Sequence, residues 1–349
     1  MLTARVSPLV CLLVMAGCAP GETDDHADAA TSRDARADRE DDGGETATDG
    51  GLTPDGGAAD ARVADLDASP GELELPPPTL FSDGFESGDL SATNPEGFRW
   101  GGPNRTSVVT QHPSDGPVVL HPTYIVAGDT TSDGTPRHWT ASEGDNSLRF
   151  RFPAGEPWSE QRFDLGTPEP ELWLRFWLRV PLNYVHGPIP SPGRNQKLLA
   201  LWMDGYEGDG DGSTVWLGFH PSGDGSDSTV AFSYSRGGYS GSLGYEQDQP
   251  FVASGSDRGR WMQMVLHVRA ETSPGASDGV IETWRRWRDE PRFTKLHESF
   301  DAAIVIPPGG PAGFRRGYLL GWANGHYAVD TEWLLDQFEL SREPLVPGY

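Results

Sequence analysis

The sequence predicts an all-β domain in which two antiparallel sheets pack face to face as a sandwich. Several segments within residues 79–349 alternate apolar and polar side chains with a period of two, which is the pattern of a strand that buries one face. Clusters of Gly, Pro, Ser and Asp separate these segments, and no long stretch has the 3.6-residue period of an amphipathic helix. Many short antiparallel strands without helices form a two-sheet sandwich or jelly roll.

The clearest strand spans residues 171–180. Its even positions, from Leu172 to Val180, are all apolar and are expected to face the core. Residues 261–269 divide in the same way, with apolar residues from Met262 to Val268 on the core face. Similar alternation predicts further strands at residues 147–152, 214–220, 230–236, 280–284, 318–322 and 333–340.

The second face of the 171–180 strand indicates a ligand. It presents Trp173, Arg175, Trp177 and Arg179, and a solvated face rarely carries two tryptophans unless something stacks on them. Sugar rings stack on indoles and Arg pairs with carboxylates, so the pattern favours a polysaccharide that carries acid groups. The alternative is that this face lies under a loop or a helix and that the arginines extend past it to solvent.

The first residues predict export. Arg5 precedes a short apolar run at residues 9–15, which is too short to span a bilayer and suits a secretory signal. Residues 15–18, Met-Ala-Gly-Cys, resemble the bacterial lipobox, in which the cysteine is lipidated and starts the mature protein. Ala19 after Cys18 implies an outer-membrane or cell-surface location in such lipoproteins. The alternative is an ordinary secretory signal with a chance cysteine.

Cysteine usage agrees with this assignment. The chain has two cysteines, Cys11 and Cys18. Cys11 would be removed with the signal and Cys18 would be acylated, so the mature domain would hold neither a disulfide nor a catalytic thiol.

Composition divides the chain into a signal peptide at 1–17, a lipidated cysteine with a tether at 18–78, and a globular domain at 79–349. The tether has no aromatic residue and cannot bury enough apolar surface to offset its ordering entropy, so it is expected to be disordered. Residues 1–75 contain 17 Asp and Glu against 5 Arg, which gives −12 of the formal net charge of −25. No basic tract indicates nucleic-acid binding, and a monomer is expected.

Four parts of the globular domain resemble concanavalin A-like jelly rolls. They are the opening FSDGFESGD at 81–89, ELWLRFWLR at 171–179 leading to NQKLLALW at 195–202, GRW at 259–261 followed by DGVIETW at 278–284, and WLLDQFELS at 333–341. Their order and spacing are most similar to the polysaccharide-lyase-like branch of that superfamily. The resemblance implies a curved front sheet whose concave face forms a glycan groove.

The same resemblance implies candidate site residues. In lyases of this kind, basic and amide groups neutralise a uronate carboxylate while a Tyr, His or Lys removes the neighbouring proton. The tyrosine-rich motif of these lyases is not recognisable, and Tyr318 and Tyr327 are loose substitutes for it. The residues predicted to be catalytic are Arg175, Gln196, Lys197 and His267, and those predicted to bind the glycan are Trp173, Trp177, Arg179, Trp216 and Gln263.

A structural calcium is also implied by the resemblance, and no other cofactor is required. In many jelly rolls of this superfamily, an aspartate on the last strand meets the N-terminal segment at a calcium ion. Asp336, Glu86 and the backbone near Gly144 resemble that arrangement.

Other chemistries lack their signatures in residues 79–349. The domain has no Glu-x-Asp-x-Glu or Glu-x-Asp-x-x-Glu pattern of retaining glucanases, no Gly-x-Ser-x-Gly elbow, no His-Glu-x-x-His and no Gly-rich phosphate loop. The sequence therefore predicts a surface-anchored polysaccharide-binding protein, with β-elimination of uronate-containing chains as the enzyme hypothesis. The alternatives are a non-catalytic glycan-binding or adhesion lipoprotein and a structural envelope protein.

Replacing Cys18 with Ser tests the predicted anchor. Because lipidation requires the thiol, Cys18→Ser is expected to move the protein from membrane fractions to soluble fractions, as followed by immunoblotting and metabolic labelling with a fatty acid. Cys11→Ser is the matched control and should leave fractionation unchanged. Equal membrane retention of Cys18→Ser would refute the lipoprotein assignment.

Overall fold

The computed structural model describes most of the predicted globular domain. No helix occurs among the residues it describes, so this part of the chain holds no helix long and apolar enough to cross a membrane. The predicted signal, Cys18 and the tether lie outside the described residues, which are 79–110, 141–181, 184, 195–207, 212–222, 227–239, 243–253, 255–328 and 330–349.

The described strands form two sheets. Sheet A has eight strands, in the order β13 (Thr294–Ala302), β12 (Gly279–Trp287), β11 (Trp261–Arg269), β6 (Glu171–Arg179), β15 (Thr331–Ser341), β4 (Asn146–Phe152) and β3 (Thr106–Thr110), with β1 (Thr79–Asp83) beside β15. Sheet B has seven strands, in the order β10 (Gly244–Ala253), β9 (Asp227–Ser235), β8 (Thr214–Ser222), β7 (Gln196–Trp202), β14 (Phe314–Trp322), β5 (Trp158–Glu169) and β2 (Arg99–Asn104).

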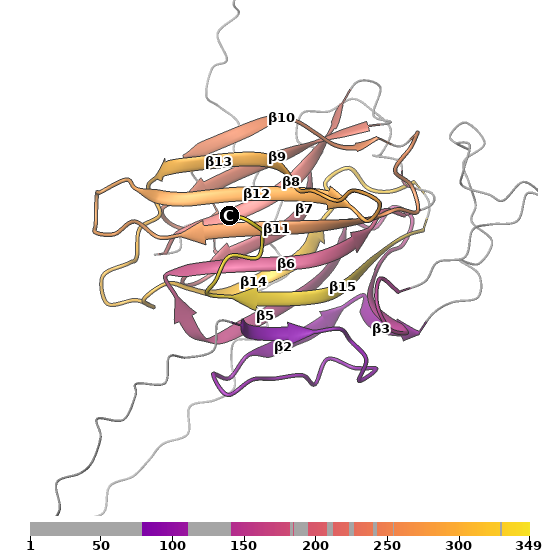
Figure 1. Ribbon diagram of the computed structural model, residues 1–349, viewed down its shortest axis with the longest axis horizontal. Helices are drawn as coiled ribbons and strands as arrows, with labels where there is room; N and C mark the ends of the chain where they lie inside the picture. The colour runs from indigo at the N-terminus through magenta and orange to yellow at the C-terminus, as the bar shows by residue number, and fades with distance from the viewer. Residues whose placement is uncertain are drawn as a thin grey trace, which may run out of the picture. The chain divides into compact units, whose positions relative to one another are not determined.

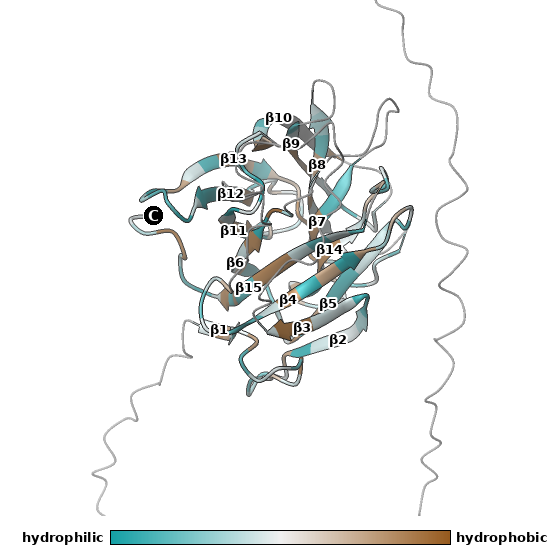
Figure 2. Ribbon diagram, turned by 90° about the vertical axis from the view of Figure 1, so that its right-hand side faces the viewer, coloured by the Kyte–Doolittle hydropathy of each residue, from teal (hydrophilic) through white to brown (hydrophobic). Residues whose placement is uncertain are grey.

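The predicted fold class, a two-sheet antiparallel β-sandwich of the jelly-roll type, is confirmed. All the strand pairs in both sheets are antiparallel, as in the central β11–β6 and β14–β7 pairs. The chain crosses repeatedly between the sheets, since β5, β6 and β7 lie in sheets B, A and B, and β13, β14 and β15 lie in sheets A, B and A. Figure 1 shows the strand order, and the turned view in Figure 2 separates β11, β12 and β13 from β7, β8 and β14.

The core between the sheets follows the predicted alternation. Leu172, Leu174, Phe176 and Leu178 of β6 face the core and pair across the sheet with the inward row of β11. These four side chains are at most 1 % exposed, and burial of a Leu or Phe side chain contributes about 1.5–3 kcal/mol.

Seven described strands were not among those predicted from alternation. Apolar and polar residues do not alternate regularly in these strands, because the strands lie at sheet edges or bury polar side chains. In β5, for example, Ser159 and Gln161 are fully buried next to the apolar Phe163. Tertiary hydrogen bonds offset this polar burial: Gln161 accepts from the Thr106 hydroxyl (2.7 Å) and donates to the Gly101 carbonyl (2.8 Å). The seven strands are β1, β2, β3, β5, β7, β10 and β13.

The outer face of sheet A is covered, and the prediction of an open tryptophan face on β6 is wrong. Trp173 is 1 % exposed and packs with Val265 and Trp284, under Phe293 and the C-terminal residues Leu345 and Val346. Figure 1 shows the C-terminus in front of β11 and β12. The alternative interpretation, a second face lying beneath a loop, therefore describes this strand.

Truncation of Trp173 tests this packing. Trp173→Ala is expected to lower the free energy of unfolding by about 3–5 kcal/mol, because it removes a buried ring and leaves a cavity under the C-terminal segment. Denaturant unfolding measures the loss. Phe300→Ala is the control, since that ring is 56 % exposed, and its effect should be small. An unfolding midpoint for Trp173→Ala equal to that of the wild type would contradict the covered face.

Candidate functional site

The outer face of sheet B carries an aromatic cluster that is separate from the main core. Ala200 and Trp202 of β7 and Tyr318 of β14 form its buried part, and Tyr206 and Trp216 pack on them from nearer the surface. These positions alternate with core leucines on the same strands, so they face away from sheet A. We call this surface the sheet B face.

Two strands distort next to this cluster. On β7, the pairing with β8 shifts between Lys197 and Leu199, and both Leu198 and Leu199 turn into the core. On β14, Leu319 and Leu320 both turn into the core, and Leu320 has a φ of 53°. Consecutive inward residues interrupt the outward row of side chains on both strands at this level.

Gly321 lies next to this interruption on β14. Its φ of 138° is one that residues with a side chain rarely adopt. A Cβ atom placed there would lie 3.4 Å from Lys197 Cβ, 3.4 Å from Glu160 Oε2 and 3.2 Å from Tyr318 Cε2. The three side chains therefore surround one point on the face.

Two tyrosines meet beside Lys197. The hydroxyls of Tyr206 and Tyr318 lie 3.1 Å apart, within hydrogen-bonding distance, and the Lys197 ammonium lies 5.9 Å from the centre of the Tyr206 ring. Burial, reinforced by the Tyr206 hydroxyl, raises the pKa of Tyr318 well above its usual value, so Tyr318 stays a neutral phenol. Among the described residues, Lys197 has no carboxylate partner within ion-pair distance.

A guanidinium completes this group. Arg162 of β5 lies directly across from Tyr318, and its Nε donates to Glu160 Oε1 at 2.5 Å. The carboxylate of Glu160 is 4 % exposed, whereas the Arg162 side chain is 47 % exposed. No described residue contacts the terminal nitrogens of Arg162 at hydrogen-bonding distance, so Glu160 holds the arginine while its outer end faces solvent.

Trp216 is the second predicted residue that lies on this face. It is half-buried against the aromatic cluster, two positions along β8 from Gly218, which pairs with Lys197. His220 follows on the same side of β8, and burial lowers the pKa of its imidazole, so His220 is neutral at pH 7.

His267 lies elsewhere, in a polar network on the covered face of sheet A. Its Nδ1 is 2.9 Å from Glu282 Oε2 and its Nε2 is 2.8 Å from Glu171 Oε1, while its ring stacks on Trp173 at 4.0 Å. Tyr349 donates its hydroxyl hydrogen to Glu282 at 2.7 Å. The prediction of His267 as a catalytic base is wrong in this structure, because both ring nitrogens are engaged and the ring is 3 % exposed.

The other candidates from sheet A are also held by neighbours. Arg175 pairs with Glu339 and donates to the Leu345 carbonyl. Gln263 is buried and accepts from Arg286 Nε at 2.7 Å.

Arg179 and Trp177 share this covered environment. Arg179 is 5 % exposed and donates to the Gly259 carbonyl. Trp177 is 7 % exposed and lies under the guanidinium of Arg286. The predicted glycan contacts of Trp173, Arg175, Trp177, Arg179 and Gln263 are therefore corrected to structural roles, since none presents a free face.

Gln196 is buried inside the sandwich. Its side-chain oxygen accepts from the Tyr327 hydroxyl, which in turn accepts from Trp333 Nε1 at 2.9 Å. Adjacent strand residues point to opposite faces, so Gln196 points inward while Lys197 points to the sheet B face. The prediction that Gln196 and Lys197 share one groove with Arg175 and His267 is wrong, because these residues lie on two sheets and on different faces.

Sequence reasoning missed three residues of the site: Tyr206, Glu160 and Arg162. Tyr206 follows β7 in a Gly-rich connection, and the other two lie on β5, whose polar sequence did not predict a strand. A usable signal was present, since Glu160 and Arg162 alternate with the apolar Phe163 and Leu165 only if β5 is extended.

Asp336 occupies the predicted place on the last strand. It is fully buried, and its carboxylate accepts the backbone N–H groups of Glu143 (3.1 Å) and Gln337 (2.7 Å). Burial, with a smaller effect of Glu86, raises the pKa of Asp336 to about 6.

Glu86 faces the same loop. It accepts the N–H groups of Asp145 and Asn146, each at 3.1 Å, and lies so close to Gly144 that a Cβ there would overlap the carboxylate. These contacts bring together the three predicted positions, but the donors are backbone N–H groups. Within the described residues there is no cluster of three or more metal-ligating side chains, so calcium at this place stays a prediction.

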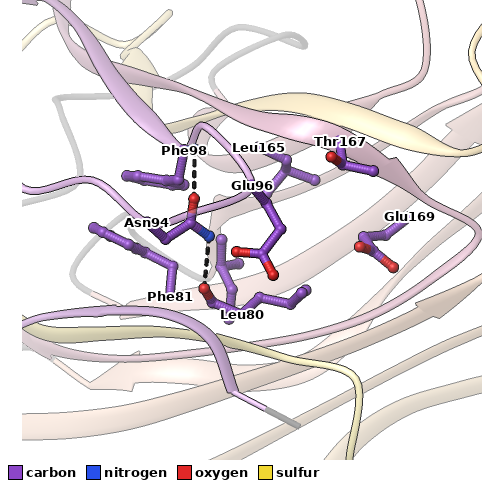
Figure 3. Close-up of a pocket in the computed structure, with 9 residues that line it drawn as sticks. Leu80, Phe81, Asn94, Glu96, Phe98, Leu165, Thr167 and Glu169 are labelled. Atoms are coloured by element: carbon purple, nitrogen blue, oxygen red, sulfur yellow. Dashed lines mark hydrogen bonds between the residues drawn. The ribbon is translucent and has the colours of Figure 1, made fainter. Parts of the chain in front are cut away.

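Two hollows elsewhere are less suited to a substrate. A narrow one of about 10 Å³, lined by Leu80, Phe81 and Glu96, has room for about one water, and Asn94 closes it by bonding to the Leu80 carbonyl and the Phe98 N–H at 2.7 Å each (Figure 3). An open hollow of about 330 Å³ is lined by three arginines whose charges are neutralised, in the pairs Arg105–Glu156, Arg149–Glu332 and Arg151–Asp330.

Comparison with known proteins gives likenesses at low identity. No protein-family model and no curated protein matches the sequence. Among solved structures, an alginate lyase in complex with an alginate tetrasaccharide is 12 % identical, with a TM-score of 0.43 over 59 % of this chain and 86 % of that chain. The alginate lyase of Aplysia kurodai is 12 % identical, with a TM-score of 0.42 over 57 % of this chain and 84 % of that chain. The alginate lyase of a Chlorella virus is 11 % identical, with a TM-score of 0.44 over 70 % of this chain and 93 % of that chain. The fold class rests on the two sheets themselves.

The buried Asp336 carboxyl predicts a pH dependence. A raised pKa in the folded state stabilises the fold below the unfolded value near 3.8, and this contribution is lost as pH rises through about 6. The loss is on the order of 3 kcal/mol, because one pKa unit corresponds to about 1.4 kcal/mol. Asp336→Asn lacks this carboxyl. In metal-free buffer, its stability relative to that of the wild type should therefore increase as the pH is raised from 4 to 7.5, as measured by denaturant unfolding.

The same pair of proteins tests the predicted calcium. If calcium binds at Asp336, adding it at pH 7.5 should raise the unfolding midpoint of the wild type and leave that of Asp336→Asn unchanged. Equal responses of the two proteins would remove Asp336 from a calcium site. A stability difference independent of pH would contradict the buried, protonated carboxyl.

Proposed function

We propose that the sheet B face binds a uronate-containing polysaccharide and cleaves it by β-elimination. The observation that carries the proposal is that Lys197, Tyr206 and Arg162 lie around Tyr318 on the sheet B face, which also carries aromatic rings. A ligand on this face would meet a cation, a phenol and a guanidinium.

Binding follows from the residue types on this face. Half-buried rings such as Trp216 and Tyr206 offer the apolar surfaces on which sugar C–H groups stack. The outer end of Arg162 has the planar donor pair that matches a carboxylate, and Glu160 fixes its direction. These features favour a sugar that carries an acid group.

The chemistry requires three functions, and the face supplies a group for each. Arg162 neutralises the uronate carboxylate, which makes the hydrogen on the neighbouring carbon acidic enough to remove. One of Lys197 and Tyr206 acts as the base in its deprotonated form, the free amine or the phenolate, and takes that proton; the C–H electron pair becomes a C=C bond, and the bond to the glycosidic oxygen breaks. The other group, in its protonated form, gives its proton to the leaving oxygen, so charge and atoms balance. Tyr318, as a neutral phenol, positions the Tyr206 hydroxyl.

The second candidate is a non-catalytic glycan-binding module. The aromatic cluster favours it by itself, since Tyr206 and Trp216 pack over the buried Trp202, and Tyr239 contacts Tyr206, whether or not Lys197 transfers a proton. Binding without cleavage is the outcome that would identify it. A structural envelope protein would do neither.

The proposed setting is the cell envelope. Lipidation at Cys18 would anchor the chain, and a disordered tether at 18–78 would let the sheet B face reach polymer away from the membrane surface.

Activity assays on two variants test the chemistry. Lys197→Ala and Tyr206→Phe are each expected to lower the rate of product formation about 100-fold or more, because a positioned acid or base typically contributes that factor. Cleavage of alginate, glucuronan or heparin is followed by the ultraviolet absorbance of the new C=C bond. Lys295→Ala is the matched control: Lys295 is the other lysine of the chain, pairs with Glu282 and Glu298 on sheet A, and should be dispensable for turnover.

Binding measurements separate the two candidates. Trp216→Ala should weaken binding of the same polymers about tenfold, whereas Tyr206→Phe should bind nearly as the wild type does. If the wild type binds the polymers but forms no ultraviolet-absorbing product, the result supports the binding module and contradicts the lyase. Loss of activity in Lys295→Ala equal to that in Lys197→Ala would place the chemistry elsewhere.

A further inference from the structure

We infer that Trp158 and Trp322 form an additional sugar-binding subsite at one end of the sheet B face, so that the site takes long polymer chains and acts within them rather than at their ends. The inference rests on the proposed function and extends it to the length of ligand. It concerns the pair of residues that follows Gly321 on β14 and precedes Glu160 on β5.

The two tryptophans form a surface pair. Trp158 of β5 and Trp322 of β14 are directly opposite in the antiparallel register, and their rings stack at 5.7 Å with an angle of 16° between planes. Both are half-buried, and neither belongs to a hydrophobic cluster of the described domain. A stacked indole pair outside the core leaves apolar surface that a ligand can cover.

The pair lies on the same face as the proposed reacting group. Trp158 Nε1 donates to Glu160 Oε2 at 3.3 Å, and the other oxygen of Glu160 holds Arg162. One buried carboxylate therefore fixes both the indole of the subsite and the guanidinium of the carboxylate site. This shared anchor sets the two positions at a constant spacing.

Polar groups at the pair suit sugar hydroxyls. The Trp322 Nε1–H bonds to no described residue and is not enclosed, so it can donate outward. Next to it, the exposed amides of Asn195 and Asn324 bond to each other at the ends of β7 and β14. A ring platform with a few fixed polar groups is the usual composition of a sugar site.

Spacing sets the length of the ligand. Trp158 lies four residues from Arg162 along β5, which corresponds to about 13 Å at a strand rise of roughly 3.3 Å per residue. Trp216, the half-buried tryptophan of the aromatic cluster, lies on the other side of Tyr318, two strands away on β8. A chain that touches both aromatic regions must extend in both directions from the reacting group, which is the geometry of internal attack.

A length series tests the subsite. Binding of the Trp158→Ala/Trp322→Ala double variant is compared with that of the wild type by calorimetry, using alginate, glucuronan and heparin as polymers and as purified oligosaccharides of two to eight sugars. The double variant should bind polymer and octasaccharide at least tenfold more weakly and disaccharide equally well. Trp216→Ala is the matched control and should weaken every length.

The outcomes separate this inference from the proposed function. If the wild type binds the polymers and the double variant binds them equally tightly, the subsite is wrong and the proposed function stands. If the wild type binds none of the polymers, both the subsite and the proposed function are contradicted. If the double variant does not fold, Trp322→Phe is used instead, because it removes the indole N–H but keeps a ring. This variant is expected to bind the polymers at least about threefold more weakly and the disaccharides as tightly as the wild type does. Unchanged binding there also overturns the subsite.

Discussion

The packing of the C-terminal segment on sheet A decides which surface of this sandwich can meet a ligand. Each sheet has an inner face that makes the core and an outer face that is either covered or free. Leu345, Val346 and Tyr349 cover the outer face of sheet A, over Trp173 and His267. The rings and charges of that face are thereby used for stability, and the sheet B face is left with the free lysine, tyrosines and arginine of the proposed site.

Local irregularity then gives the sheet B face its chemistry. A regular pair of strands would fill the outer face with evenly spaced side chains. The register shift in β7 and the positive φ at Leu320 send consecutive leucines into the core, and Lys197, Glu160 and Tyr318 close in around Gly321. Strand distortions next to functional groups often redirect a side chain in this way. Here Lys197 lies on the sheet B face, and its neighbour Gln196 lies inside the sandwich.

Two charge arrangements show how similar residues acquire different roles. His267 lies between Glu171 and Glu282, with Lys295 and Tyr349 closing the network, so both ring nitrogens of His267 and both carboxylate oxygens of Glu282 have partners within the protein. Lys197 has no carboxylate within ion-pair distance among the described residues, and Arg162 uses only its Nε to pair with Glu160. Satisfied groups stabilise a fold, whereas cationic donors that remain available are suited to an anionic ligand.

Period-two alternation in the sequence determined the fold class and the inner faces of β6 and β11, because hydrophobic burial acts on one residue at a time and leaves its pattern in the chain. The alternation also separated the outer row of β6, with its tryptophans, from the core. It could not show what covers that row, since the cover comes from residues 345–349, far along the chain. Nor could it bring Arg162, Lys197 and Tyr206 together, because their meeting depends on strand order in sheet B, on the register shift in β7 and on the backbone of Leu320. Faces follow from local chemistry, but neighbours across a sheet are set by tertiary pairing.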